Sequence, residues 1–219
     1  MIDTAAKSGA GVSGTGSFFR KVDWAAFWTG LVISFIVYFL TAAPSVTLED
    51  SGELAVAGDH LGVPHPPGYP IWSMCAWLFA RGLSFVTFRG QPDPAWAIAV
   101  MSGFFGALAT GLTAMLVTRT SSDIIRLHNS ESSTVSETEF TAAGCQTSKT
   151  DLLDIICWVS GVSASLVFAF SPVMWSQATI VEVYTRNACF RMLIFVLTYR
   201  WMCRPTDNLL WMTAFVFGL

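Results

Sequence analysis

Long apolar stretches separated by polar segments are the main pattern along this chain. Residues 24–43 form twenty consecutive positions without a charged side chain, enough to cross a hydrocarbon core of about 30 Å as a helix. Largely apolar stretches follow at 95–118, 152–170, 188–202 and 209–219. The pattern predicts an all-α, multispanning transmembrane protein. Because the last stretch is too short to cross a bilayer, we expect the chain to be the N-terminal part of a longer protein.

Residues 71–88 are long enough either to span the membrane or to lie at its interface, since they would be about 27 Å long as a helix. Arg81 lies in the second half of this segment, where a charged side chain is costly inside a bilayer. We therefore expect a juxtamembrane helix that lies at the interface, within the first external loop.

The distribution of basic residues predicts which loops share a side of the membrane. Three basic residues precede the first span, so residues 1–23 are expected to be a disordered cytoplasmic tail. Residues 44–70 contain no Lys or Arg and are expected outside, together with residues 171–187. Residues 119–151 lack a helical or strand period and are expected to be a flexible cytoplasmic loop.

Composition supports a membrane protein and excludes several function classes. The chain is 53% hydrophobic and only 12% charged, about half the charge of a soluble domain. Its net charge of −3 gives no basic surface for nucleic acid, so we expect membrane lipids and no nucleic acid as partners. The five cysteines form no C-x-x-C pair, which leaves no zinc or disulfide framework.

The first external segment, residues 44–70, carries four carboxylates and two histidines. Asp50 and Glu53 are three residues apart, so they share one face of a helix. Two carboxylates this close repel, which raises the pKa of one and makes it a better proton acceptor. The alternative is structural: Asp50 or Ser51 caps the helix while Glu53 completes a capping box.

The next residues, from His65 to Pro70, form a turn stiffened by prolines. This stiffness is typical of a binding loop that holds His65 and Tyr69 at the start of the following helix. An alternative for this region is a metal site formed by Asp50, Asp59, His60 and His65. The spacings of these residues match no specific metal motif, so we expect no metal.

The second external segment, residues 171–187, contains one carboxylate, Glu182. Glu182, Arg186 and the nearby Arg191 are costly beside a membrane unless they are paired or face a cavity, which makes them functional candidates. The alternative is a simple ion pair between Glu182 and Arg186, four residues apart on a helix end.

Three strings in this chain resemble a known family: LEDSGELAVAGDHLGVPHPPGYPIW, PDPAWAIAVMSGFFGALATGL and FSPVMWSQATIVEVYTRNACF. They are similar to a GT-C superfamily of multispanning membrane glycosyltransferases, in a bacterial family catalogued as a domain of unknown function. The animal relative of that family is an endoplasmic-reticulum protein O-mannosyltransferase that modifies plexin-type IPT domains. The resemblance covers about residues 24–200.

The resemblance implies a glycosyltransferase with a polyprenyl-phosphate-linked sugar as donor and no required cofactor. The sugar, mannose by analogy, would pass to an acceptor hydroxyl on a protein or glycan at the external face. The membrane would be the bacterial inner membrane, or the endoplasmic reticulum in a eukaryote. The alternative is a transporter or flippase-like protein, in which the membrane-embedded charges mark a substrate path.

The resemblance also implies roles for individual residues. Asp50 matches the acid of the family's first loop and would be the general base. Glu53 would tune that base or bind sugar hydroxyls, and Glu182 would line the cavity opposite. The leaving phosphate would be met by Arg186, Arg191, His65 or Arg81. The substrate-binding set implied in this way consists of Glu49, His65, Tyr69, Glu182 and Arg186.

Overall fold

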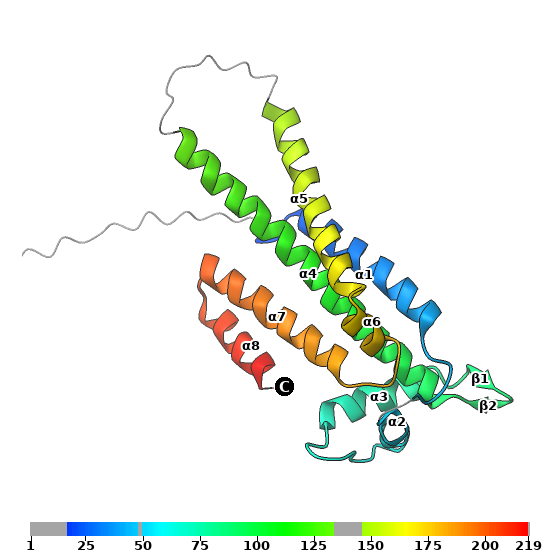
Figure 1. The fold of residues 1–219 in the computed structure, drawn as a ribbon. Helices are drawn as coiled ribbons and strands as arrows, with labels where there is room; N and C mark the ends of the chain where they lie inside the picture. Colours follow the sequence, from blue (N-terminus) through cyan, green and yellow to red (C-terminus); the bar gives the residue numbers. More distant parts are fainter. Residues whose placement is uncertain (1–16, 48–49, 134–145, 219) are drawn as a thin grey trace, which may run out of the picture.

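The computed structural model describes residues 17–47, 50–133 and 146–218. Within these residues the chain forms eight helices and one two-stranded hairpin (Figure 1). The elements are α1 (Lys21–Thr41), α2 (Ser51–His60), α3 (Pro70–Gly82), β1 (Thr87–Phe88), β2 (Gln91–Pro92), α4 (Pro94–Ser133), α5 (Gln146–Ala169), α6 (Pro172–Ala178), α7 (Tyr184–Cys203) and α8 (Asp207–Phe217). The predicted all-α, multispanning class is confirmed.

Helix α4 is the centre of the bundle. Helices α1 and α5 pack along it, and α7 crosses it on the other side (Figure 1). In the described part, α1, α4 and α5 are the helices long and apolar enough to cross a membrane. Their most apolar stretches are 67% buried in α4 but only 28% buried in α1 and α5, so α4 forms the core while the other two expose apolar side chains.

A close helix contact joins α4 to α5 at Gly161. A Cβ atom at this position would lie only 2.6 Å from the carbonyl oxygen of Ala114. Glycine therefore allows the two backbones to approach more closely than any other residue would, as small residues do in membrane helix pairs.

The first helix begins earlier than the apolar pattern predicted. The amide of Arg20 donates to the Asp23 carboxylate at 2.8 Å, and the guanidinium of Arg20 binds the same group. Asp23 is fully buried, and Arg119 of α4 lies 3.9 Å from it. Because these charges fold inward, residues 17–23 are not the disordered tail expected; the rest of that prediction, residues 1–16, falls outside the described residues.

The prediction of a loop over residues 119–151 is wrong at both ends. Helix α4 continues far beyond its apolar stretch, and α5 starts before the next one. Arg119 and Asp123 form an ion pair at 3.0 Å one turn apart, and the hydroxyl of Tyr199 donates to Asp123 at 2.8 Å. These polar contacts extend the helix where hydrophobic periodicity is absent; residues 134–145 lie outside the described residues.

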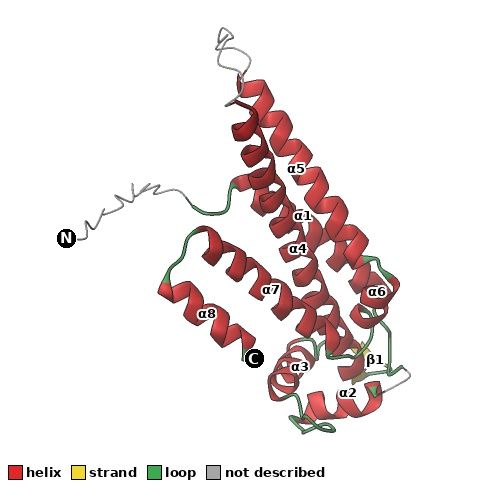
Figure 2. Cartoon of the chain, turned by 60° about the vertical axis from the view of Figure 1, so that its left-hand side comes forward, coloured by secondary structure: helices red, strands yellow, loops and turns green. Residues whose placement is uncertain are grey.

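Helices α2 and α3 lie across one end of the bundle and pack on the start of α4 (Figures 1 and 2). At 13 residues α3 is about 20 Å long, too short to span a bilayer. This agrees with the interfacial helix predicted for residues 71–88, but α3 is shorter because the chain turns into the β1–β2 hairpin.

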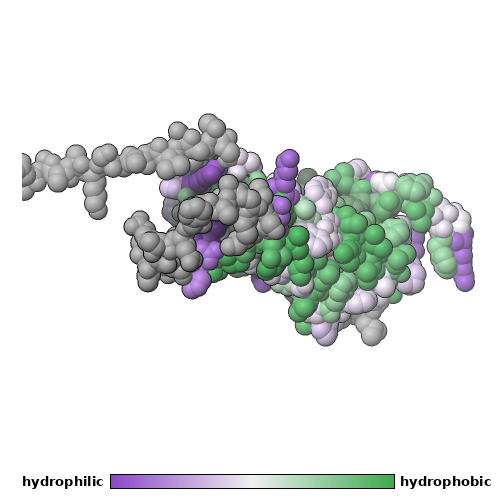
Figure 3. All heavy atoms as spheres, turned by 90° about the horizontal axis from the view of Figure 1, so that it is seen from above, coloured by the Kyte–Doolittle hydropathy of each residue, from purple (hydrophilic) through white to green (hydrophobic). Residues whose placement is uncertain are grey.

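Helices α7 and α8 form a hairpin beside α4 (Figure 2). Helix α7 starts four residues before the predicted stretch at 188–202. At 20 residues it is long enough to cross a membrane, but it is not among the described helices that are also apolar enough to do so. Three arginines interrupt its apolar surface: Arg186, Arg191 and Arg200. Viewed from the end of the bundle away from α2 and α3, the molecule shows a broad apolar surface, as Figure 3 shows.

Candidate active site

A cluster of three ionisable side chains lies at the start of α2. Glu53 accepts a hydrogen bond from the backbone amide of His65 at 2.6 Å, and its other oxygen lies 3.2 Å from Nδ1 of the same residue. On the opposite edge of the imidazole, Nε2 is 3.9 Å from Oδ2 of Asp50. The imidazole therefore lies between two carboxylates, in what we call the Asp50–Glu53–His65 cluster.

The capping-box alternative is wrong. Asp50 occupies the N-cap position of α2 but forms no side-chain cap hydrogen bond, and both oxygens of Glu53 are directed to His65. The backbone and side-chain hydrogen bonds from His65 hold the pKa of Glu53 below its ordinary value. This direction is opposite to the rise expected from repulsion between the two carboxylates.

The backbone after α2 explains how the cluster forms. Leu61 ends the helix in the left-handed conformation, and the chain reverses so that His65 returns to the first turn of α2. Gly68, with a φ of 87°, and Tyr69, with a φ of 41°, then lead into α3. The rings of His65 and Tyr69 meet edge to face at 6.0 Å, so the predicted turn does present these two side chains together.

The cluster borders a shallow groove of about 500 Å³ between α2 and the loop that follows it. Glu53 lines this groove, and the Asp50 side chain is 63% exposed. A polar molecule can therefore reach both carboxylates from solvent. Glu49, the other acid of this motif, lies outside the described residues.

The two loops predicted to share a side of the membrane are in direct contact. The amide of Ala43 donates to the carbonyl of Thr179 at 2.7 Å, and the Ser51 hydroxyl donates to the carbonyl of Val181 at 3.3 Å. These bonds join the residues just after α1 and the start of α2 to the segment between α6 and α7. The structure therefore brings the acidic segment and the Glu182 segment together.

Glu182 is held by its backbone beneath the cluster. Its carbonyl oxygen accepts hydrogen bonds from Nε1 of Trp72 at 3.1 Å and from Oγ of Ser102 at 3.2 Å. Its carboxylate, which is buried, accepts the amide of Val183 at 3.2 Å. Glu182 does not line the groove next to Glu53, and its position opposite Asp50 across one cavity stays a prediction.

Arg186 is a buried cation on the first turn of α7. Its side chain is 6% exposed, donates to Oδ1 of Asn187 at 3.2 Å, and leaves Nε without a hydrogen-bond partner. No carboxylate of the described residues lies within 4.0 Å of it, so the Glu182–Arg186 ion pair is also wrong. Arg186 instead lies near Tyr69 and Cys75 of the α3 region, with its guanidinium 5.9 Å from the centre of the Phe190 ring.

The remaining candidates are separated from the cluster. Arg81 binds Asp59, through both its carboxylate at 3.5 Å and its carbonyl oxygen at 3.1 Å. This pairing holds α3 to the C-terminal end of α2. Arg81, which was considered for binding the leaving phosphate, therefore already has a carboxylate partner. Over the described ranges no three His, Cys, Asp or Glu side chains gather as metal ligands.

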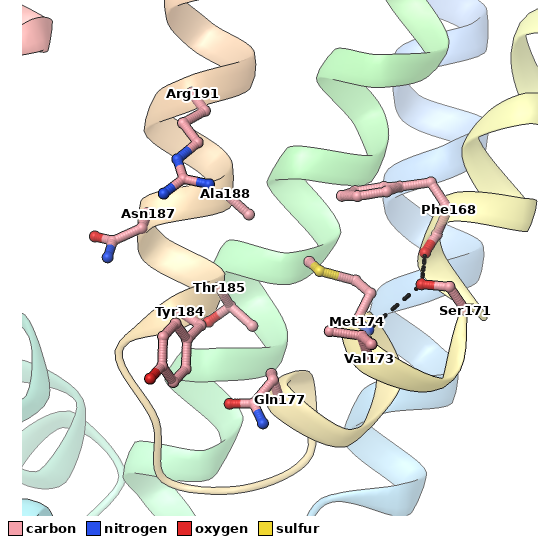
Figure 4. A pocket seen from close by; sticks show the side chains of 10 residues that line it. All are labelled: Phe168, Ser171, Val173, Met174, Gln177, Tyr184, Thr185, Asn187, Ala188 and Arg191. Carbon is pink, nitrogen blue, oxygen red and sulfur yellow. Dashed lines mark hydrogen bonds between the residues drawn. The ribbon is translucent and has the colours of Figure 1, made fainter.

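A second cavity, of about 610 Å³, lies between α6 and α7 (Figure 4). Its walls combine apolar side chains with several polar ones; they are Phe168, Ser171, Val173, Met174, Gln177, Tyr184, Thr185, Asn187, Ala188 and Arg191. Sequence reasoning noted Arg191 as a costly charge but missed Thr185, because a threonine in a helical stretch gives no signal of its own. It also missed Trp72 and Ser102, whose role depends on a carbonyl about eighty or more residues away.

Comparisons with known proteins agree with this architecture. The model of the protein O-mannosyl-transferase TMEM260 N-terminal domain matches residues 50–219. Protein O-mannosyl-transferase tmem260 of Dictyostelium discoideum is 27% identical over 185 residues, 82% of this chain and 18% of that protein. Protein O-mannosyl-transferase TMEM260 of Mus musculus is 30% identical over 164 residues, 75% of this chain and 18% of that protein. No solved structure matches the chain.

These matches confirm the resemblance drawn from the acidic, proline-rich and second-loop strings. The chain spans 18% of the length of each of these relatives. With 170 of its 219 positions matched by the family model, the chain belongs to the family of the protein O-mannosyl-transferase TMEM260 N-terminal domain.

Proposed function

We propose that this chain is the catalytic-head portion of a GT-C type protein O-mannosyltransferase. Its donor is a polyprenyl-phosphate-linked mannose, and its acceptor is a hydroxyl group of a protein at the external face of the membrane. The names of its relatives support the transfer of mannose to protein. The observation that carries the proposal is the Asp50–Glu53–His65 cluster, which offers accessible carboxylates at the end of a membrane helix bundle.

The proposed reaction is a single displacement. The acceptor oxygen forms a bond to the anomeric carbon while the bond from that carbon to the phosphate oxygen breaks. The acceptor proton passes to the base, and polyprenyl phosphate leaves with the bonding electron pair. A positioned general base contributes about 10²- to 10⁴-fold to such a step.

Asp50 is the better base of the two carboxylates. Its side chain is 63% exposed and its oxygens come no nearer to the His65 ring than 3.9 Å, so they are accessible to an incoming hydroxyl. Glu53 instead has both oxygens directed to His65, which makes it a positioning residue for the imidazole. The geometry supports this assignment, which agrees with the role that the resemblance implies for Asp50.

The leaving phosphate needs positive charge nearby. Arg186 is the candidate that geometry favours, because it is buried, retains a donor without a partner, and lies near Tyr69 at the start of α3. His65, whose ring meets the ring of Tyr69, would complete a set of donors around the anion.

Transfer of mannose by membranes that contain the full-length protein tests this proposal. The donor is a short-chain prenyl-phosphate-linked radiolabelled mannose, and the product is labelled protein. We expect Asp50→Asn to reduce transfer by about 100-fold or more. Asp59→Asn is the matched control, since it makes the same substitution on the same helix at the end bound to Arg81. Normal transfer by Asp50→Asn at normal expression would overturn the proposal.

A further inference from the structure

A further cavity, of about 340 Å³, lies at the end of the bundle away from α2 and α3, where the segment before α1 meets the turn between α7 and α8 (Figure 1). Its lining residues are Ser17, Phe18, Phe19, Trp24, Arg200, Arg204, Thr206 and Leu209. None of them lines the groove beside Glu53 or the cavity between α6 and α7. We call this site the Arg200–Arg204 cavity.

One wall of the Arg200–Arg204 cavity is aromatic and is held by the bundle itself. Arg119 of α4 donates to the carbonyl oxygen of Phe18 at 2.9 Å, and the rings of Phe18 and Tyr199 lie 6.3 Å apart. Trp24, in the first turn of α1, is 44% exposed. A tryptophan at the start of a membrane helix is typical of the level at which lipid headgroups begin. The wall can therefore receive the first part of an acyl chain.

The opposite wall carries two arginines one helical turn apart. The amide of Arg204 donates to the carbonyl oxygen of Arg200 at 2.9 Å, which places both residues on one side of α7. Like charges at this spacing destabilise a helix, and an anion between them would remove that cost. Arg200 is exposed, and no carboxylate of the described residues lies within 4.0 Å of its guanidinium.

The second arginine is fixed at the cavity by the aromatic wall. The guanidinium of Arg204 lies 5.7 Å from the centre of the Phe18 ring, a cation–π distance. The hydroxyl groups of Ser17 and Thr206 border the same space and can each donate a hydrogen bond. Charged and neutral donors thus border one cavity whose other wall is apolar, which is the composition that a phospholipid headgroup and its glycerol end require.

We propose that the Arg200–Arg204 cavity binds the headgroup of an anionic phospholipid. The phosphate lies between the two guanidinium groups, and the acyl chain begins against Trp24. The basic residues before α1 predict that this end faces the cytoplasm, where basic pockets beside membrane helices attract anionic lipids. A zwitterionic lipid fits less well, because its choline group would meet two arginines. The site does not depend on the proposed transferase activity.

Lipid binding to the purified full-length protein in a neutral detergent tests the site. The probes are phosphatidylglycerol, phosphatidylcholine and glycerol 3-phosphate, each titrated and measured by native mass spectrometry. We expect Arg200→Gln to weaken phosphatidylglycerol binding about fivefold or more, by loss of a charged hydrogen bond. Arg200→Lys keeps the charge and should weaken it less. Neither substitution breaks an ion pair within the described residues, so both variants should fold.

Two control variants separate this site from general attraction of lipid to basic residues and from the active site. Arg126→Gln removes another exposed arginine, which lies on α4 and lines a different pocket, and should leave phosphatidylglycerol binding unchanged. Asp50→Asn should also leave it unchanged, so failure of the proposed transferase activity does not affect this test.

Three results would overturn the proposal. The first is phosphatidylglycerol binding that neither Arg200→Gln nor Arg204→Gln weakens. The second is phosphatidylcholine binding as tight as that of phosphatidylglycerol, because the two arginines would then not select a net negative charge. The third is glycerol 3-phosphate binding as tight as that of the lipid, because the aromatic wall would then contribute nothing and the ligand would be a soluble phosphate compound.

Discussion

Replacement of Trp72 by phenylalanine tests the junction between α3 and the Glu182 segment. Trp72 is fully buried, and its indole Nε1 donates to the carbonyl oxygen of Glu182 at 3.1 Å. Phenylalanine keeps an aromatic ring but cannot donate. The lost hydrogen bond costs about 1 kcal/mol. A vacated volume of a few tens of Å³ costs about 1 kcal/mol more, at ~24 cal/mol per Å³. We therefore expect the free energy of unfolding to fall by about 2 kcal/mol.

Equilibrium unfolding in mixed micelles of a mild detergent and sodium dodecyl sulfate, followed by far-ultraviolet circular dichroism, measures this change. Trp77→Phe is the matched control, because it makes the same substitution on the same helix. Trp77 is half-buried, and its indole donates no hydrogen bond within the described part of the chain. We expect the control to change stability by no more than about 0.5 kcal/mol.

A double-mutant cycle with Ser102→Ala sharpens the test. The Ser102 hydroxyl also donates to the Glu182 carbonyl, at 3.2 Å, so each single variant leaves one of these two donors in place. The double variant removes both, and we expect a cost greater than the sum of the single ones by about 1 kcal/mol. Unfolding of Trp72→Phe at the same detergent ratio as Trp77→Phe, or purely additive costs, would refute this account of the junction.

Three further predictions concern packing, pH and buried charge. Gly161→Ala should lower the free energy of unfolding by about 1–3 kcal/mol in the same assay, because the new Cβ would lie 2.6 Å from the carbonyl oxygen of Ala114. Gly82→Ala is the control and should leave the free energy of unfolding unchanged, because nothing lies within 4 Å of its Cβ. Folding lowers the pKa of Glu53, so the hydrogen bonds of its carboxylate stabilise the turn at pH values above the unfolded-state pKa. This stabilisation is lost as the pH falls through the folded-state pKa. Protection of the turn from hydrogen exchange, relative to the intrinsic exchange rate at each pH, should therefore fall as the pH drops below about 4, and Glu53→Gln should remove this pH dependence. Asp23→Ala should cost about 2 kcal/mol, because Arg20 loses a charged hydrogen-bond partner while Arg20 and Arg119 keep Asp154 and Asp123, and an unchanged unfolding midpoint would contradict this reading.

Hydropathy alone was sufficient for the fold class and for the three long apolar helices. Runs of about twenty apolar residues can satisfy their backbone within a bilayer only as helices. The same reasoning predicted that the helix containing Arg81 does not span the membrane, and the structure has a helix of 13 residues there, too short to do so. It failed at residues 119–133, because that part of α4 is stabilised by Arg119 and Asp123 rather than by an apolar face.

The acidic motif and the proline-rich turn could also be predicted from the sequence, since their residue types are unusual beside a membrane. Their pairing was not, because Glu53 could reach either the α2 backbone or the returning chain, and only the reversal after Leu61 selects His65. Likewise, the charges of Glu182 and Arg186 suggested an ion pair by spacing. The structure separates them, because the Glu182 carbonyl is held by Trp72.

Local composition and length were enough to predict the long apolar helices and the two polar segments that carry the candidate residues. Tertiary structure decided which side chains share a site. The α6–α7 cavity with Thr185 and Arg191 forms because consecutive helices pack on α4 with a gap between them, and no local pattern specifies that gap.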